Sequence, residues 1–227
     1  MEGEPGSQAS PDERDEAGFP PGFFRRTDEA PDEQFYAPRR LVTHIDDRAI
    51  AAVGRLYAHL GIDGGASEPR RVLDLMSSWV SHFVTPPAEL VALGMNRDEL
   101  EANEAATERV GHDLNLTPTL PFPDESFDAV TCCVSIDYLV RPVAVLRDVA
   151  RVLRPGGLVV LTFSNRCFPT KAIHGWLMTG DEGHLRIVRE YLRRTGRFAE
   201  AEAALCTPPG TPGDPLYAVW AARQAGW

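Results

Sequence analysis

Short apolar runs of strand length alternate with longer stretches of helical periodicity along most of the chain. In the first helical stretch, apolar residues recur at helical spacing between Ile50 and Leu60, and Asp46 or Asp47 can cap it. A second helical stretch, 142–153, begins with a proline and keeps its valines on one side. Helices are also expected at 97–109 and 187–192, and strands at 72–75, 88–93, 111–115, 129–136, 158–163, 201–207 and 216–222.

This order of elements predicts an α/β fold. The runs at 129–136 and 158–163 are apolar throughout, as expected of central strands that are covered on both faces. The last two strands flank a loop rich in proline and glycine, which favours a hairpin at the sheet edge. The pattern therefore predicts one doubly wound, mostly parallel seven-stranded sheet with a C-terminal antiparallel hairpin. Such sheets bind ligands beyond the carboxyl ends of their parallel strands.

The 227 residues divide by composition into a tail, an arm and one domain. Residues 1–33 are acidic and rich in proline and glycine, so we expect a largely disordered tail. Three phenylalanines within 19–24 leave open whether that part packs onto the body. Residues 34–60 are expected to form an N-terminal arm and the first helix, and residues 61–227 the α/β domain.

Charge and cysteine usage limit the partners that the body can bind. The formal net charge is −10, but ten of the 33 acidic residues lie within the first 34 positions. The remaining body is nearly neutral and offers no basic surface to a nucleic acid. No apolar run has membrane-spanning length, no signal segment follows Met1, and the four cysteines lack zinc-binding spacing. We therefore expect a cytoplasmic protein with no metal, membrane or nucleic-acid partner; the oligomeric state is left open.

Two motifs in the α/β pattern are distinctive. The first is Leu-Pro-Phe-Pro-Asp-Glu-Ser-Phe-Asp at 120–128, and the second is Val-Leu-Arg-Pro-Gly-Gly at 152–157, which lets a helix stop and reverse into a parallel strand. The pair resembles the small-molecule branch of the class I S-adenosylmethionine-dependent methyltransferases, often called type 11. The resemblance covers about 72–163. It implies that 61–227 form a methyltransferase-like, Rossmann-type domain with S-adenosylmethionine as cofactor and a small-molecule substrate.

The resemblance assigns cofactor contacts to the ends of the first four strands. Asp74 would help place the methionine amino group, unless it caps the following helix. Asn96 would hold the ribose hydroxyls less strongly than the usual carboxylate, although a plain turn role fits it equally well. Asp113 would meet the adenine amino group. With their neighbours, the expected cofactor-binding residues are Asp74, Met76, Ser77, Ser78, Met95, Asn96, Asp113, Leu114 and Ser135.

The turn after the first strand departs from the family pattern. Members usually carry Asp-x-Gly-x-Gly-x-Gly there, whereas the three glycine positions hold Met76, Ser78 and Val80 in this chain. Met76 and Val80 cannot adopt a positive φ without strain. Ser77, Ser78 and Ser81 are small and can donate hydroxyl groups to the cofactor carboxylate.

Aromatic, basic and imidazole side chains are expected around this cofactor site. The arm segment 34–45 is predicted to cover the carboxyl end of the sheet near Trp79 and His82, as a substrate lid or as a packing arm. Trp79 fits the core equally well, His82 fits a structural role, and 165–166 fits an ordinary loop. The candidate substrate-binding residues are Tyr36, Arg39, Trp79, Asn165 and Arg166, and the candidate catalytic residues are His44, His82 and Tyr138.

The resemblance favours an S-adenosylmethionine-dependent methyltransferase, a transferase that needs no catalytic triad or metal, because the protein mainly aligns the nucleophile with an activated methyl group. Two alternatives are open. One is a non-methylating enzyme of the same fold that uses the cofactor for an intramolecular displacement or cyclisation. The other is a methyltransferase-like binding protein that has lost cofactor use, which the altered turn at 76–80 suggests.

Overall fold

One mixed sheet organises the computed structural model, which describes residues 15, 17–210 and 212–226. Its strands are β1 Arg71–Leu75, β2 Glu89–Gly94, β3 Glu108–Gly111, β4 Phe127–Cys133, β5 Leu153–Phe163, β6 Glu202–Leu205 and β7 Tyr217–Ala222. They lie in the order β3-β2-β1-β4-β5-β7-β6. The first five strands are parallel, whereas β7 pairs antiparallel with both β5 and β6. The predicted seven-stranded α/β sheet with its antiparallel hairpin is confirmed.

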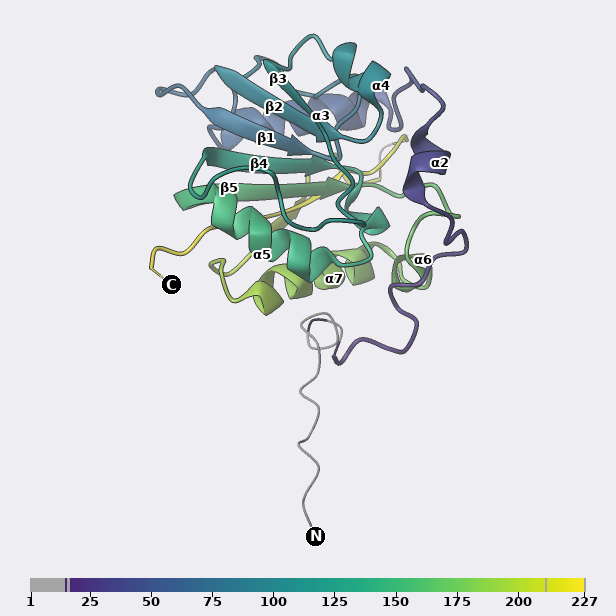
Figure 1. Ribbon diagram of the computed structural model, residues 1–227. Helices are drawn as coiled ribbons and strands as arrows, with labels where there is room; N and C mark the ends of the chain where they lie inside the picture. The colour runs from purple at the N-terminus through teal and green to yellow at the C-terminus, as the bar shows by residue number, and fades with distance from the viewer. Residues whose placement is uncertain (1–14, 16, 211, 227) are drawn as a thin grey trace.

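Helices cover both faces of this sheet. They are α2 Asp32–Tyr36, α3 Asp47–His59, α4 Arg97–Glu101, the 3-10 turn η1 Ile136–Tyr138, α5 Pro142–Val152, α6 His174–Leu177 and α7 Asp181–Thr195. Figure 1 shows α5 and α7 on one face and α3 on the other. Helix α3 begins where the sequence predicts, because the Asp46 side chain accepts hydrogen bonds from the backbone nitrogens of Arg48 and Ala49.

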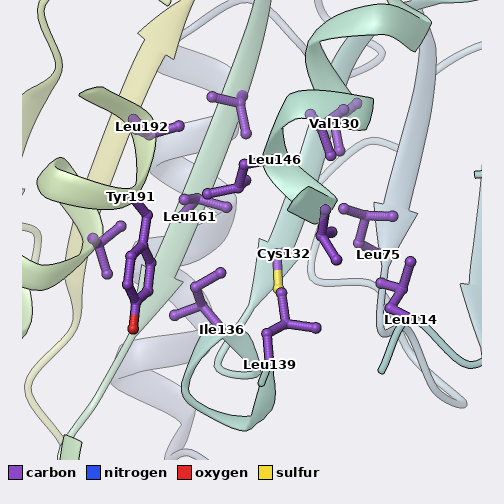
Figure 2. Close-up of a cluster of buried hydrophobic side chains, with 14 of the residues drawn as sticks. Leu75, Leu114, Val130, Cys132, Ile136, Leu139, Leu146, Leu161, Tyr191 and Leu192 are labelled. Atoms are coloured by element: carbon purple, nitrogen blue, oxygen red, sulfur yellow. The ribbon is translucent and has the colours of Figure 1, made fainter. Parts of the chain in front are cut away.

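Alternate residues of the strands supply two apolar cores. Leu73, Val130 and Leu161 belong to the core that packs against α5 and α7, and Figure 2 shows Leu161 beside Leu146 of α5 and close to Leu192 of α7. Val72, Ala129 and Val160, their neighbours in sequence, pack against α3 on the opposite face. The period of two along each strand produces this division. Burial on both faces explains the unbroken apolar runs in the sequence.

Several elements differ from the predicted boundaries, and α4 and β3 are the two for which the difference bears on the site. Helix α4 ends at Glu101 instead of continuing to residue 109, and β3 occupies 108–111 instead of 111–115. The Asn103 side chain donates to the carbonyl oxygen of Ser78 and to Ser81 Oγ, which holds the chain at this point against the turn after β1. The following residues then pair with the free edge of β2. A tertiary contact thus overrides helical composition here.

Residues 17–33 were expected to belong to a largely disordered tail, but they pack against the body. Phe19, Phe23 and Phe24 form a cluster with Tyr191 of α7, with ring centroids 4.7–6.2 Å apart. Gly175 allows this approach, because a Cβ there would lie 2.2 Å from the Phe23 ring. Burial of the three phenylalanine rings offsets the conformational entropy that this segment loses when it becomes ordered, and the prediction from composition had given that entropy more weight. Positions 1–14 and 16 of the predicted tail lie outside the described residues.

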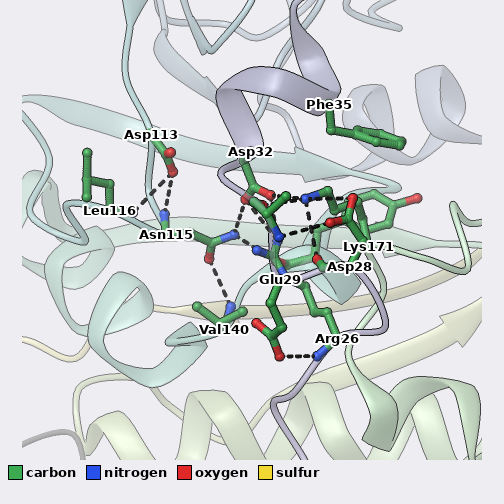
Figure 3. A network of polar contacts seen from close by, with 12 residues as sticks. Arg26, Asp28, Glu29, Asp32, Phe35, Asp113, Asn115, Leu116, Val140 and Lys171 are labelled. Carbon is green, nitrogen blue, oxygen red and sulfur yellow. Dashed lines mark hydrogen bonds and ion pairs between the residues drawn. The ribbon is translucent and has the colours of Figure 1, made fainter.

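A buried ionic cluster fastens the same segment. Lys171, the single lysine of the chain, is completely buried, and its ammonium group lies 3.1 Å from Asp32 Oδ1, 3.2 Å from Asp28 Oδ2 and 2.7 Å from the Ala30 carbonyl oxygen. Asp32 also accepts two hydrogen bonds from Arg26. Figure 3 shows this cluster reaching across to Asn115, whose amide donates to Asp32 at 2.8 Å. The N-terminal segment is therefore held by charge as well as by aromatic packing.

We expect Lys171→Met to lower the free energy of unfolding by about 3 kcal/mol or more, because it leaves the buried Asp32 carboxylate without one of its cations. Urea denaturation followed by circular dichroism measures the change. Arg186→Met is the matched control, since the 3.8 Å ion pair of Arg186 with Glu182 is exposed, and its loss should change stability by less than about 1 kcal/mol. A Lys171 variant as stable as the control would contradict the importance of the cluster.

Candidate functional site

A cavity of about 530 Å³ lies at the carboxyl ends of the parallel strands. The segments that follow β1, β2, β3 and β4 form its floor, and the arm covers it. This is the size of a pocket for a small ligand or a cofactor. The predicted site residues that line it are Tyr36, His44, Asp74, Met76, Ser77, Ser78, Trp79, His82, Met95, Asn96, Asp113, Leu114, Ser135, Tyr138, Asn165 and Arg166.

Arg39 is the predicted site residue that does not line the cavity. Its side chain is exposed, and the next residue, Arg40, faces inward instead. The Arg40 guanidinium carbon lies 4.9 Å from the centre of the Phe35 ring, and its Nη2 donates to the Phe35 carbonyl oxygen at 2.8 Å. Neighbouring arginines cannot be told apart by composition, because the fold of the arm decides which one turns inward.

Asp74 lies buried at the end of β1 among hydroxyl groups. Its Oδ2 accepts from Ser77 and Ser81 at 2.7 and 2.6 Å, and its Oδ1 accepts from Thr131 of β4 at 2.8 Å. Burial raises the pKa of this carboxyl, and the three hydroxyl donors partly oppose that rise. The carboxylate therefore organises the turn after β1 from below.

The turn after β1 includes a backbone conformation that usually calls for glycine, although a different residue adopts it. Met76 has a φ of +52°, in the left-handed region that usually calls for glycine. The nitrogen of Ser77 donates to the Leu93 carbonyl oxygen at 2.8 Å, which ties the turn to β2. Gly94 makes this contact possible, because a Cβ there would lie 2.2 Å from the Ser77 carbonyl oxygen. The missing glycine of the turn is thus partly compensated by a glycine on the neighbouring strand.

Asn96, at the end of β2, fastens the arm. Its Nδ2 donates to the carbonyl oxygens of Tyr36 and Ala37 at 2.8 and 3.1 Å. Its Oδ1 accepts from the backbone nitrogen of Glu99 and so caps α4. Both amide hydrogens are therefore committed to the arm.

Glu99 and Asn103 also surround the turn, and sequence reasoning did not select them. Glu99 is 9% exposed. Its carboxylate accepts hydrogen bonds from the backbone nitrogen of Arg40 at 2.6 Å and from Ser78 Oγ at 2.7 Å. The sequence signal was the spacing Asn96-x-x-Glu99, in which a helix cap is followed by an acid one turn later on the same side of the helix.

Asp113 and Leu114 follow β3 on another wall of the cavity. Asp113 Oδ1 accepts from the backbone nitrogens of Asn115 and Leu116 at 2.9 and 3.1 Å, as drawn in Figure 3. This turn fixes the carboxylate while its Oδ2 has no hydrogen-bond partner among the described residues. Leu114 is buried and joins the core beside the cavity. Across the floor, Ser135 Oγ donates to the Cys133 carbonyl oxygen.

The three candidate catalytic side chains lie in different electrostatic surroundings. Burial lowers the pKa of His82 and of His44, against the attraction of Asp74 and of Glu99 respectively. Burial raises the pKa of Tyr138 well above its ordinary value, and its hydroxyl accepts from the Phe168 nitrogen at 2.9 Å. Tyr138 is therefore protonated at neutral pH, whereas both imidazoles are neutral and can accept a proton.

The arm contacts the candidate substrate side of the cavity. Trp79 Nε1 donates to the Val42 carbonyl oxygen at 3.1 Å, so this indole seals the arm against the turn. His44 packs edge-on against Phe168 with a centroid distance of 5.1 Å. Arg166 lies at the rim, largely exposed and 3.4 Å from Asp214. Residues 34–45 therefore lie over the carboxyl ends of the strands, close to Trp79.

Two further features bear on the chemistry of the described residues. No three histidine, cysteine, aspartate or glutamate side chains among them are grouped so that they could hold a metal ion. Within the same part of the chain, no helix has the length and apolar character needed to cross a bilayer.

Comparison with known proteins places this geometry in context. A family model described as a methyltransferase domain matches residues 75–161. The ubiquinone/menaquinone biosynthesis C-methyltransferase UbiE of Pseudomonas fluorescens (strain Pf0-1) is 28% identical over 190 residues, covering 71% of this chain and 73% of that protein. The ubiquinone biosynthesis O-methyltransferase of Parvibaculum lavamentivorans is 29% identical over 185 residues, covering 73% and 72%.

Solved structures show the same fold at lower identity. A SAM dependent methyltransferase from Archaeoglobus fulgidus has a TM-score of 0.55 and 16% sequence identity, covering 78% of this chain and 95% of that one. The fold of this chain therefore has a counterpart among proteins of known structure.

Asn96→Asp should release the arm. Aspartate still caps α4, but it cannot donate, and it places a carboxylate against the Tyr36 and Ala37 carbonyl oxygens, at a cost of about 2 kcal/mol. Trypsin should then cut after Arg39 or Arg40 about tenfold faster or more, because cleavage follows the population of the open arm. Mass spectrometry of timed digests locates the cut.

Asp98→Asn, at an exposed position of the same helix, is the matched control and should leave the cleavage rate unchanged. Equal rates for both variants and the wild type would mean that Asn96 does not hold the arm.

Proposed function

Because this chain belongs to the class I S-adenosylmethionine-dependent methyltransferases, in their type 11 branch, we propose that it transfers the methyl group of this cofactor to a small molecule. The observation that carries the proposal is the arm-covered cavity at the carboxyl ends of β1, β2 and β4. Its size suits a cofactor with a small acceptor, and the covering arm leaves little room for a macromolecule.

The residues of the cavity fit the cofactor. Ser77 and Ser78 donate their hydroxyl hydrogens to Asp74 and Glu99 and present hydroxyl oxygens to the cavity, which suits the amine of an amino-acid end. Asp113 Oδ2 suits the exocyclic amine of adenine, and apolar Leu114 lies next to it. The bound cofactor supplies an activated methyl group on a sulfonium. The protein then has to hold the acceptor in line and keep water out.

The acceptor side of the cavity favours a planar aromatic substrate with a nucleophile that loses a proton. Aromatic rings from Tyr36, Trp79, Tyr138 and Phe168 line it, and such rings stack on planar ligands. The names of the relatives refer to ubiquinone and menaquinone biosynthesis. We propose His82 as the base that takes the proton, because its imidazole is neutral at pH 7. Tyr138, His44, Asn165 and Arg166 position the acceptor.

Methyl transfer is favoured over the two alternatives. Both relatives described above are named methyltransferases, which supports this reaction over cyclisation. Loss of cofactor binding was suggested by the altered turn at 76–80, yet Met76 adopts the left-handed conformation and Gly94 admits the turn. The four cysteines are free, a state typical of the reducing cytoplasm, where we propose that the protein acts.

Isothermal calorimetry should detect binding of S-adenosylmethionine and S-adenosylhomocysteine to the full chain. Asp113→Asn should weaken binding of S-adenosylhomocysteine about tenfold, because the amide keeps the turn but presents a donor to the adenine amine. Asp124→Asn, an exposed change away from the cavity, is the control. A folded protein that releases no heat with either ligand at millimolar concentration would rule out the proposed function.

The rate of methyl transfer should fall as the pH decreases through the pKa of His82, because protonation removes the base. Burial places that pKa below the ordinary value of 6.5, so the fall should occur below pH 6.5. His82→Gln should lower kcat about a hundredfold and abolish this part of the profile.

Mass spectrometry of the methylated product, with an aromatic hydroxyl compound as acceptor, measures the rate. His59→Gln, at an exposed position of α3, should behave as the wild type. An unchanged pH profile in the His82 variant would exclude His82 as the base.

A further inference from the structure

Asn96 is the residue that the family resemblance places at the ribose, but its side chain is engaged elsewhere. The two amide hydrogens are donated to the Tyr36 and Ala37 carbonyl oxygens, and Oδ1 accepts a hydrogen bond from the backbone nitrogen of Glu99. These partners fix the orientation of the amide, because a backbone nitrogen can only donate and a carbonyl oxygen can only accept. The side chain has one lone pair left, which cannot hold two vicinal hydroxyl groups.

Glu99 brings a carboxylate to the same corner of the cavity. It lies one turn further along the same side of α4, and it lines the cavity together with Asn96 and Ser78. Its two carboxylate oxygens accept one hydrogen bond each, one from the backbone nitrogen of Arg40 and the other from Ser78 Oγ. Because a carboxylate oxygen can accept two, each has one lone pair left.

The surroundings of Glu99 are incomplete for a buried charge. The Glu99 residue is 9% exposed, and among the described residues neither lysine nor arginine forms an ion pair with its carboxylate. A buried carboxylate needs either a cation or several hydrogen-bond donors. Two vicinal hydroxyl groups of a sugar, one to each oxygen, would complete the set of donors.

We propose that Glu99, and not residue 96, is the carboxylate that accepts the ribose hydroxyls of the bound nucleoside. This inference rests on the proposed function, since it concerns the same cofactor site. The chain separates two tasks along one helical turn: Asn96 holds the arm and Glu99 holds the sugar. Because Glu99 also accepts from Arg40, sugar binding and arm closure share one carboxylate.

Calorimetry with two ligands tests this assignment without measuring activity. The ligands are S-adenosylhomocysteine and its 2′-deoxyribose analogue. Wild-type protein should bind the ribose compound about tenfold more tightly than the analogue, because the carboxylate forms charge-assisted hydrogen bonds with both hydroxyls. Glu99→Gln should lose about tenfold in affinity for the ribose compound and should bind the analogue nearly as well as wild type does, so the two ligands become similar.

The choice of glutamine keeps the local structure. Its carbonyl oxygen can still accept from Arg40, and its amide can donate to Ser78 Oγ, because a hydroxyl group also accepts. Glu99→Asp, which retains the charge but withdraws the carboxylate by one methylene, is a second variant should glutamine prevent folding. It should also lose affinity for the ribose compound alone. Asp98→Asn is the neighbouring control and should match the wild type with both ligands.

Equal losses for the two ligands would overturn the proposal, because Glu99 would then act through the structure of the turn. Unchanged affinity in the Glu99 variants would overturn it as well. If S-adenosylhomocysteine binds, and its affinity falls in Asp113→Asn but not in the Glu99 variants, then only the assignment of Glu99 fails. Absence of binding to wild type would reject the proposed function together with it.

Discussion

The ion pairs and hydrogen bonds of the Asp32 carboxylate are the interactions that hold the N-terminal segment beside the cavity. It is buried where a charge is costly, and Arg26, Lys171 and Asn115 all donate to it. These three residues come from the N-terminal segment, from the loop before α6 and from the loop after β3. The Asp32 carboxylate thus joins three stretches of chain that are distant in sequence (Figure 3). Asp32 is also the first residue of helix α2, and it lines the cavity.

Once this segment is held, the rest of the arm closes through backbone groups. Asn96 donates to two carbonyl oxygens of the arm, Trp79 donates to a third, and Glu99 accepts a hydrogen bond from a backbone nitrogen of the arm. Backbone groups that would otherwise be buried without partners are satisfied in this way. The cover therefore depends on a few polar side chains of the turns after β1 and β2, so substitutions in these turns affect both the arm and the ligand site.

The turn after β1 shows how a strained local conformation can persist. Met76 pays the steric cost of a positive φ, while Asp74 and its three hydroxyl partners hold the turn from below. Gly94 removes the obstruction from the neighbouring strand. The departure from the family motif is thus accommodated by residues outside the motif.

Periodicity and short motifs in the sequence determined the alternation of strands and helices, the cap of α3 and the C-terminal hairpin, because these follow from local spacing. Most of the residues around the cavity were indicated by the family resemblance of the two motifs, and not by spacing. The tertiary structure alone decided that Arg40 replaces Arg39, that Lys171 secures residues 17–33, and that β3 begins at residue 108. Each of these depends on a partner far away in the sequence, which local pattern does not encode. The engagement of Asn96 with the arm has the same origin, since only the folded chain brings residues 36 and 96 together.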